Sequence, residues 1–206
     1  MVKSNLAVLL AERGLKITKV SEETKISRTT LTALYYNHCS GVQFDTVNTL
    51  CKYLGITPGD LFTFAPVDFV IVDCEIWPDG NRATGNFYIE ISDGKNKSRA
   101  FLGFNCDFSV SLGTLESAAV DVYLLGGADQ DSIPEEEIEK ANETLIRTIQ
   151  QIPVIFIKDI EESIERAIES EIEYTFKEIE DGNGDVYGGV SKDCEIEYRF
   201  PPEFRR

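Results

Sequence analysis

Long apolar runs are absent from this 206-residue sequence, which sets the first limits on its class. No stretch reaches the roughly 20 apolar residues that a membrane-spanning helix needs, so we expect no membrane segment. The apolar run near the N-terminus ends at Glu12 and Arg13 without a small-residue cleavage site, which argues against a signal peptide. These absences predict a cytoplasmic protein.

Metal-ligating side chains are scarce, with one histidine and five cysteines. The cysteine count is odd, and no two cysteines lie closer than 12 residues, the spacing between Cys39 and Cys51. Such spacing fits free buried thiols in a reducing compartment better than a disulfide framework or a CxxC zinc site. His38 beside Cys39 does not supply a full set of zinc ligands. The sequence therefore predicts no metal and no cofactor.

Basic side chains are outnumbered, at 20 against 36 acidic ones, and the imbalance is unevenly spread. Residues 1–66 carry 7 basic and 5 acidic groups, a net charge of +2, whereas residues 67–206 carry 13 and 31, a net charge of −18. The first part can face a polyanion, and the second part would repel one. Because no Gly/Ser-rich or Pro-rich linker follows Pro66, we expect two directly joined domains, 1–66 and 67–206.

Helical spacing dominates residues 1–66. Leu6, Leu9 and Leu10 share one helical face, and later apolar residues repeat in the same way. The sequence predicts five short helices in an all-α domain, with a helix-turn-helix break between the second and the third. Residues suited to beginning or ending these helices are Gly14, Thr18, Ser27, Gly55 and Pro58.

The order and spacing of these elements are specific over residues 17–62, which read ITKVSEETKISRTTLTALYYNHCSGVQFDTVNTLCKYLGITPGDLF. Three parts of this run, ISRTTL, FDTVNTLCKYL and GITPGDL, resemble the lambda-repressor/Cro-like, or XRE-family, DNA-binding domain. The resemblance covers about a third of the chain. Two residues depart from it: Lys25 occupies a turn position that is often glycine, and Ser21 stands where alanine is usual.

The resemblance implies that double-stranded DNA is the ligand of residues 1–66 and that the third helix lies in its major groove. By position, the candidate base-reading residues are Arg28, Thr29, Thr30 and Thr32. An arginine can pair with guanine, and threonine methyl groups can meet thymine methyl groups. The alternative is that these threonines are ordinary solvated helix positions. The candidate phosphate contacts are Thr18, Lys19, Asn37, His38 and Ser40.

Residues 67–206 change from strand-like alternation to helical spacing and back. Strands are expected near 68–77, 86–92, 99–112 and 117–125, helices over 134–151 and 153–170, a strand near 171–177, a turn at 181–184 and a last strand over 194–200. This order predicts an α+β domain with a mainly antiparallel sheet and two helices. No family resemblance covers this half.

No enzyme site is evident. The many glutamates are interpreted as solvated helix faces, because nothing marks any of them as buried. A self-cleaving serine–lysine domain is rejected as well. Ser109, Ser111 and Lys158 are present, but no Ala-Gly or Cys-Gly cleavage site lies between the two halves.

Two hypotheses of function remain. The first is a sequence-specific transcriptional regulator, a repressor that controls its own operon in a phage or mobile element. Its acidic domain would dimerise the protein or sense a signal, since specific binding needs two copies on neighbouring half-sites. The alternative is a protein inhibitor of the DNA-mimic, anti-CRISPR or anti-nuclease type. There the acidic domain binds a basic protein, and the N-terminal domain regulates transcription.

Overall fold

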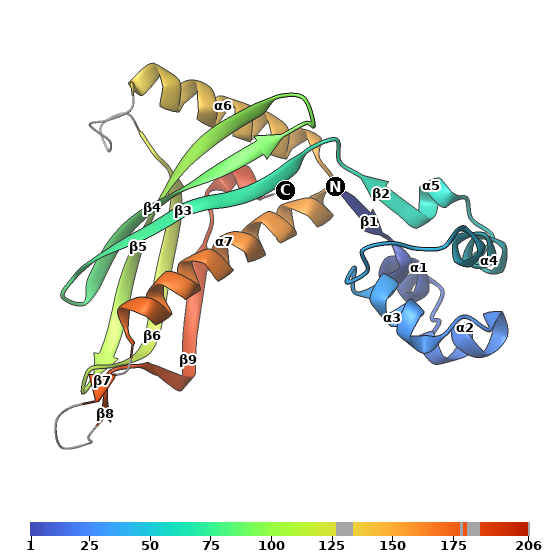
Figure 1. The fold of residues 1–206 in the computed structure, drawn as a ribbon, viewed down its shortest axis with the longest axis horizontal. Helices are drawn as coiled ribbons and strands as arrows, with labels where there is room; N and C mark the ends of the chain where they lie inside the picture. Colours follow the sequence, from blue (N-terminus) through green and yellow to red (C-terminus); the bar gives the residue numbers. More distant parts are fainter. Residues whose placement is uncertain (127–133, 178, 181–185, 206) are drawn as a thin grey trace. The chain divides into compact units, whose positions relative to one another are not determined.

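Two units make up the protein in the computed structural model (Figure 1). They are Met1–Pro66 and Val67–Arg206. The structure describes residues 1–126, 134–177, 179–180 and 186–205. No helix in these ranges is both long enough and apolar enough to cross a membrane. The turn expected at 181–184 lies outside the described residues.

The first unit is a cluster of short helices around leucine side chains. Leu6, Leu31 and Leu50 are fully buried in this cluster. The unit is helical as expected, but a short antiparallel sheet, which the expectation of an all-α domain did not include, joins its two ends. Its strands have only three residues each, too few for an alternating pattern to reveal them. The elements are β1 (Val2–Ser4), α1 (Leu6–Glu12), α2 (Ile17–Thr24), α3 (Arg28–Tyr35), α4 (Phe44–Leu54), α5 (Pro58–Leu61) and β2 (Phe62–Phe64).

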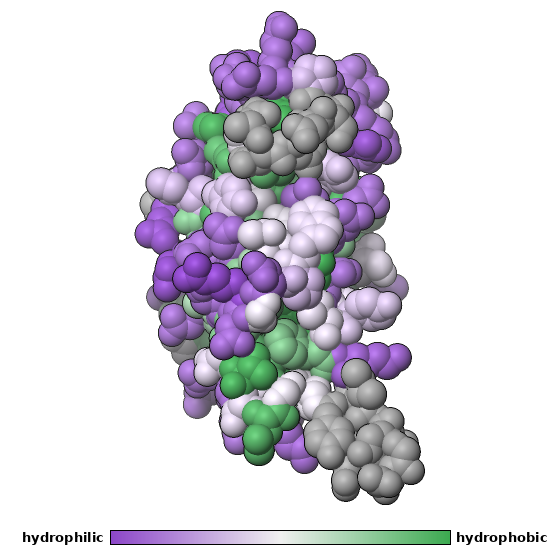
Figure 2. All heavy atoms as spheres, turned by 90° about the vertical axis from the view of Figure 1, so that its left-hand side faces the viewer, coloured by the Kyte–Doolittle hydropathy of each residue, from purple (hydrophilic) through white to green (hydrophobic). Residues whose placement is uncertain are grey.

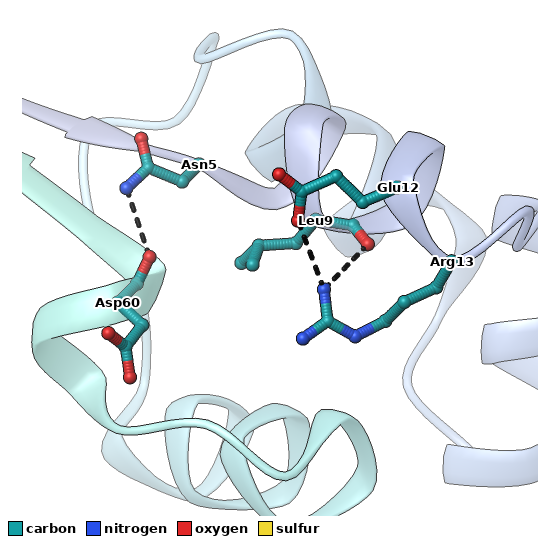
Figure 3. A network of polar contacts seen from close by, with 5 residues as sticks. All are labelled: Asn5, Leu9, Glu12, Arg13 and Asp60. Atoms are coloured by element: carbon teal, nitrogen blue, oxygen red, sulfur yellow. Dashed lines mark hydrogen bonds and ion pairs between the residues drawn. The ribbon is translucent and has the colours of Figure 1, made fainter.

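Polar side chains tie α1 to its surroundings (Figure 3). The Asn5 amide Nδ2 donates to the Asp60 carbonyl oxygen at 3.0 Å, linking the start of α1 to α5. At the other end of the helix, Arg13 Nη1 donates to the Leu9 carbonyl oxygen at 3.1 Å and lies 3.4 Å from Glu12 Oε2. The Arg13 guanidinium is therefore engaged with its own helix.

Local chemistry sets most of the helix ends in this unit. Gly14 and Gly55 have left-handed backbones beyond α1 and α4, which glycine adopts without a Cβ clash. Ser27 caps α3 as predicted, because its hydroxyl accepts from the Thr30 backbone N–H. The expectation that Thr18 caps α2 was wrong. The helix begins at Ile17, so its cap position is Lys16, and the Ile17 side chain packs against the leucine core.

A twisted five-stranded sheet forms the centre of the second unit, with strand order β3-β4-β5-β6-β9. The first four strands form the expected antiparallel meander, whereas β9 pairs with β6 in parallel. The elements are β3 (Asp68–Asp79), β4 (Arg82–Ser92), β5 (Lys97–Ser111), β6 (Thr114–Leu124), α6 (Glu135–Gln151), α7 (Val154–Thr175), β7 (Ile179–Glu180), β8 (Val186–Tyr187), β9 (Val190–Arg199) and a 3₁₀ turn (Pro202–Phe204).

The strand expected near residues 171–177 was wrong, because α7 continues to Thr175. Ile172 lies four residues after Ile168, so it extends the apolar stripe of the helix, and both side chains are fully buried. Tyr174, which the alternating pattern would have turned inward with Ile172, is 76% exposed. Packing against the core therefore selects the helical spacing over the two-residue alternation of a strand.

The two helices pack against opposite faces of the sheet. Phe108 and Phe176 meet edge to face at 5.0 Å on the α7 side, where the Tyr198 hydroxyl also donates to the Glu165 carbonyl oxygen. On the other side, Phe101 packs against Ile138 of α6. The side of the unit in Figure 2 is largely hydrophilic, with apolar residues gathered toward one end. Charged side chains, 13 basic and 31 acidic in residues 67–206, are available to form such a surface.

Candidate nucleic-acid interface

The turn between α2 and α3 is fixed by side-chain bonds to its backbone. Lys25 adopts the left-handed conformation, with φ of 64°, at the position where the resemblance favours glycine. Ser21, the other departure, donates from its hydroxyl to the Ile26 carbonyl oxygen at 2.7 Å. Thr24 Oγ1 accepts from the Ile26 backbone N–H. These bonds hold a tight turn without glycine.

One face of α3 is buried and the other is open. Leu31 and Leu34 are buried in the leucine core, which directs Arg28, Thr29 and Thr32 toward solvent. These three are among the predicted base-reading residues. They lie in the first five positions of a helix whose N-terminus is capped by Ser27, the end that meets bases in helix-turn-helix domains.

Thr30 differs from the other predicted base-reading residues. It is half-buried, and its Oγ1 lies 2.8 Å from the Ser27 hydroxyl, within hydrogen-bond distance. Its backbone N–H is the donor to the Ser27 cap, at 3.1 Å. The Thr30 hydroxyl is therefore already engaged at the start of α3.

An acidic side chain that the sequence reasoning missed lies close to Arg28. Glu22 Oε1, on α2, is 3.9 Å from Arg28 Nη2, and the two side chains are 72% and 64% exposed. Exposed pairs at this separation contribute little stability, so the contact leaves Arg28 available to a ligand. The neighbouring Glu23 bonds instead to the Tyr53 hydroxyl of α4, and this bond raises the pKa of Tyr53.

Asn37 ends α3 and ties it to β1. Its left-handed backbone, with φ of 57°, allows the N–H groups of Asn37 and His38 to close the helix on the carbonyl oxygens of Leu34 and Ala33. The Asn37 side chain accepts from the Ser4 backbone N–H at 2.6 Å and donates to the Ser4 carbonyl oxygen at 3.2 Å. Both ends of its amide are thus engaged in holding the fold.

The remaining predicted phosphate contacts are exposed. Thr18 and Lys19 lie on the first turn of α2, and His38 and Ser40 follow the end of α3. The His38 imidazole stacks on the Tyr36 ring with a centroid distance of 6.0 Å. The structure therefore gives Thr18, Lys19, His38 and Ser40 positions on the surface of the domain.

Comparisons with known proteins decide the family of the first unit. The sequence model of the Cro/C1-type helix-turn-helix DNA-binding domain matches residues 5–66. An uncharacterised helix-turn-helix transcriptional regulator of Bacillus subtilis, YozG, is 30% identical over 60 residues, which are 29% of this chain and 71% of that protein. The chain belongs to the Cro/C1-type helix-turn-helix family. The match covers the first unit and leaves the second unit without a family.

A solved structure gives a weaker comparison for the same part of the chain. A Bacteroides fragilis protein proposed to bind DNA is 22% identical over 31% of this chain and all of its own, with a TM-score of 0.28.

Two contacts in the Cro/C1-type domain could not be predicted from the sequence. They are the hydrogen bonds between Asn37 and Ser4 and the contact between Glu22 and Arg28. Both join residues from different elements, so no local pattern in the sequence signals them.

Proposed function

We propose that the protein is a sequence-specific transcriptional regulator that binds double-stranded DNA through the N-terminal half of α3. The observation that supports this most directly is the exposure of Arg28, Thr29 and Thr32 on the capped end of α3 in a Cro/C1-type domain. An arginine at such a position pairs with the N7 and O6 atoms of guanine, and threonine methyl groups pack on thymine.

Phosphate contacts from the flanking elements would hold α3 in register. Thr18 and Lys19 at the start of α2, and His38 and Ser40 after α3, are exposed and carry donors suited to phosphate oxygens. We assign Thr30 and Asn37 a positioning role, because their side chains already bond within the domain.

Two copies of the chain are needed for tight binding. The net charge of +2 on residues 1–66 gives one copy few phosphate contacts, so its affinity would be low and steeply dependent on salt. The second unit, with a net charge of −18, would be repelled by DNA and is free to join two copies. We therefore propose a cytoplasmic homodimer that represses by occupying an operator, with its own promoter as the first candidate.

The base-reading role of Arg28 can be separated from its charge. The affinity of the full chain for DNA preceding its own gene is measured by fluorescence anisotropy, with unrelated DNA of equal length as reference. Arg28→Gln should lower the affinity for the specific DNA by about 5- to 150-fold and the affinity for unrelated DNA by much less. The matched control is Lys52→Gln, an exposed lysine in the last turn of α4.

Equal losses in the two variants would contradict base reading by Arg28 and leave only general electrostatic attraction. A further variant tests the neighbouring carboxylate. Glu22→Gln removes a negative charge 3.9 Å from the Arg28 guanidinium, so it should raise the affinity for DNA. An unchanged affinity would place Arg28 and Glu22 away from the bound DNA.

A further inference from the structure

A groove in the second unit lies where α6 covers only part of a sheet face. The rings of Tyr88 and Phe101 meet edge to face at 5.1 Å on adjacent strands, and Ile138 and Ala141 of α6 pack against them. Beside this contact, a groove of about 750 Å³ is lined by residues from β3, β4, β5 and α6. That volume is within the range of small-molecule binding sites.

The walls of the groove are held firmly in place. The Asn142 side chain of α6 donates to the Leu125 carbonyl oxygen at 2.8 Å and accepts from the Phe101 backbone N–H at 3.4 Å. It thereby replaces the strand partner that β5 loses where β6 ends. Asn142 is buried, so these bonds are shielded from water and fix α6 against the sheet. A pre-formed groove loses little free energy to ordering when it binds a ligand.

The chemistry of the groove combines an aromatic floor with cations. Lys97 Nζ lies 2.6 Å from Glu90 Oε1, and this hydrogen bond holds the pKa of Glu90 below its usual range. Arg99 is the cross-strand partner of Glu90 and also lines the groove. Lys140, one residue before Ala141, brings a third cation, from the α6 side.

The local charge balance sets the groove apart from the rest of the second unit. Three basic and three acidic side chains line it, in a unit with 13 basic and 31 acidic groups overall. An anion therefore meets less repulsion here than the overall charge of the unit suggests. Arg99 from the sheet and Lys140 from the helix can both donate to such a group. The acidic side chains among the lining are Asp73, Glu90 and Glu137.

We propose that this groove binds a small organic anion with a flat apolar body, of the aromatic carboxylate or sulfonate class. The body would pack on Tyr88, Phe101 and Ala141, and the anionic group would lie between Arg99 and Lys140. The site lies within the second unit, so it does not depend on the DNA-binding function proposed for α3.

The test uses 1-anilinonaphthalene-8-sulfonate, a fluorescent aromatic anion, with the full chain. Fluorescence titration and equilibrium dialysis should show saturable binding at one site per chain. Arg99→Gln/Lys140→Gln should weaken binding by at least tenfold. The control, Lys158→Gln/Lys192→Gln, removes the same charge from two exposed positions of α7 and β9 and should change affinity by less than twofold.

Two further measurements make the result decisive. N-phenyl-1-naphthylamine has a similar aromatic body without the sulfonate and should bind at least tenfold more weakly. Thr144→Trp fills the groove from α6 without changing its charge and should abolish saturable binding while leaving the circular dichroism spectrum unchanged. Equal binding of the two probes, equal losses in the two double variants, or binding that does not saturate would overturn the proposal.

Discussion

Replacing Asn37 with alanine would remove the two side-chain hydrogen bonds that join the end of α3 to β1. Ser4, which provides both backbone partners, is only 4% exposed, so water cannot readily replace the lost bonds. Alanine would also have to adopt the left-handed backbone that Asn37 holds at φ of 57°. The substitution therefore combines a hydrogen-bond loss with a conformational cost.

The two contributions can be given magnitudes. Leaving a buried backbone donor or acceptor without a partner costs about 1–3 kcal/mol. A left-handed backbone costs an ordinary L-residue about 1–2 kcal/mol, and much less for glycine. We expect Asn37→Ala to lower the free energy of unfolding of the first unit by about 2–4 kcal/mol. Asn37→Gly, which restores the backbone freedom, should lower it by roughly 1 kcal/mol less.

The assay is urea denaturation of the full chain followed by far-ultraviolet circular dichroism. The one tryptophan, Trp77, lies in the second unit, so its fluorescence reports that unit separately. The destabilisation should appear in the circular dichroism transition of the first unit. Substitutions of surface residues usually change the free energy of unfolding by less than about 0.5 kcal/mol. A decrease smaller than that for Asn37→Ala would therefore refute a stabilising role of its hydrogen bonds to Ser4.

Three other perturbations test the second unit. Gly85→Ala should lower its stability by about 1–3 kcal/mol in urea denaturation, because the added Cβ would overlap the Phe104 ring and the Glu75 carbonyl oxygen. Gly41→Ala in the first unit, which meets open space, should leave that stability unchanged, and a loss below about 0.5 kcal/mol in Gly85→Ala would contradict this packing. Cys106 is buried, and burial raises the pKa of its thiol to about 12. Iodoacetamide should therefore alkylate Cys106 only when urea unfolds the protein. Rapid alkylation of the folded protein, detected by mass spectrometry, would argue against that burial. Burial, with Glu169 and Glu162 nearby, raises the pKa of Glu165, so the folded state favours its protonated form. Its contribution to stability is present at acidic pH and is lost as pH rises from about 4.3 through the raised pKa. Glu165→Gln should flatten the fall in stability over that window, and an unchanged slope would exclude Glu165 as a source.

The helix ends of the first unit were predictable where one residue determines the geometry. Gly14 and Gly55 supply left-handed backbones, and Ser27 supplies a cap, so each acts through bonds within a few residues. Thr18 did not predict the start of α2, because that start depends on the packing of Ile17 against the core. A preference worth about 1 kcal/mol at a cap is easily outweighed by burial of an apolar side chain.

Features that join distant parts of the chain could not be predicted from the sequence. The pairing of β1 with β2 and the parallel addition of β9 to β6 both link segments tens of residues apart. Residues 171–175 fit both a strand and a helix by spacing, and Ile172 faces inward in either. The exposure of Tyr174, which a strand would have turned inward as well, decides for the helix. The cysteines were expected to be buried, but only Cys106 is, and the other four are half-buried.

The candidate site was predictable only in part and for a different reason. Arg28 and its neighbours were identified through resemblance to a family, and the structure shows that Arg28, Thr29 and Thr32 face solvent. The engagement of Asn37 with Ser4 and of Thr30 with Ser27 depends on the folded domain. The groove beside α6 has no sequence signal, because its lining comes from four separate elements.

We propose that two copies of this chain read a specific DNA sequence through α3. The most direct measurement is selection of binding sites by the full-length protein from a random duplex library, at a salt concentration near 0.15 M. We expect an enriched inverted repeat with half-site centres about one helical turn apart, and loss of its strongest guanine preference in Arg28→Gln. Failure to enrich any sequence, or an unchanged motif in Arg28→Gln, would contradict it.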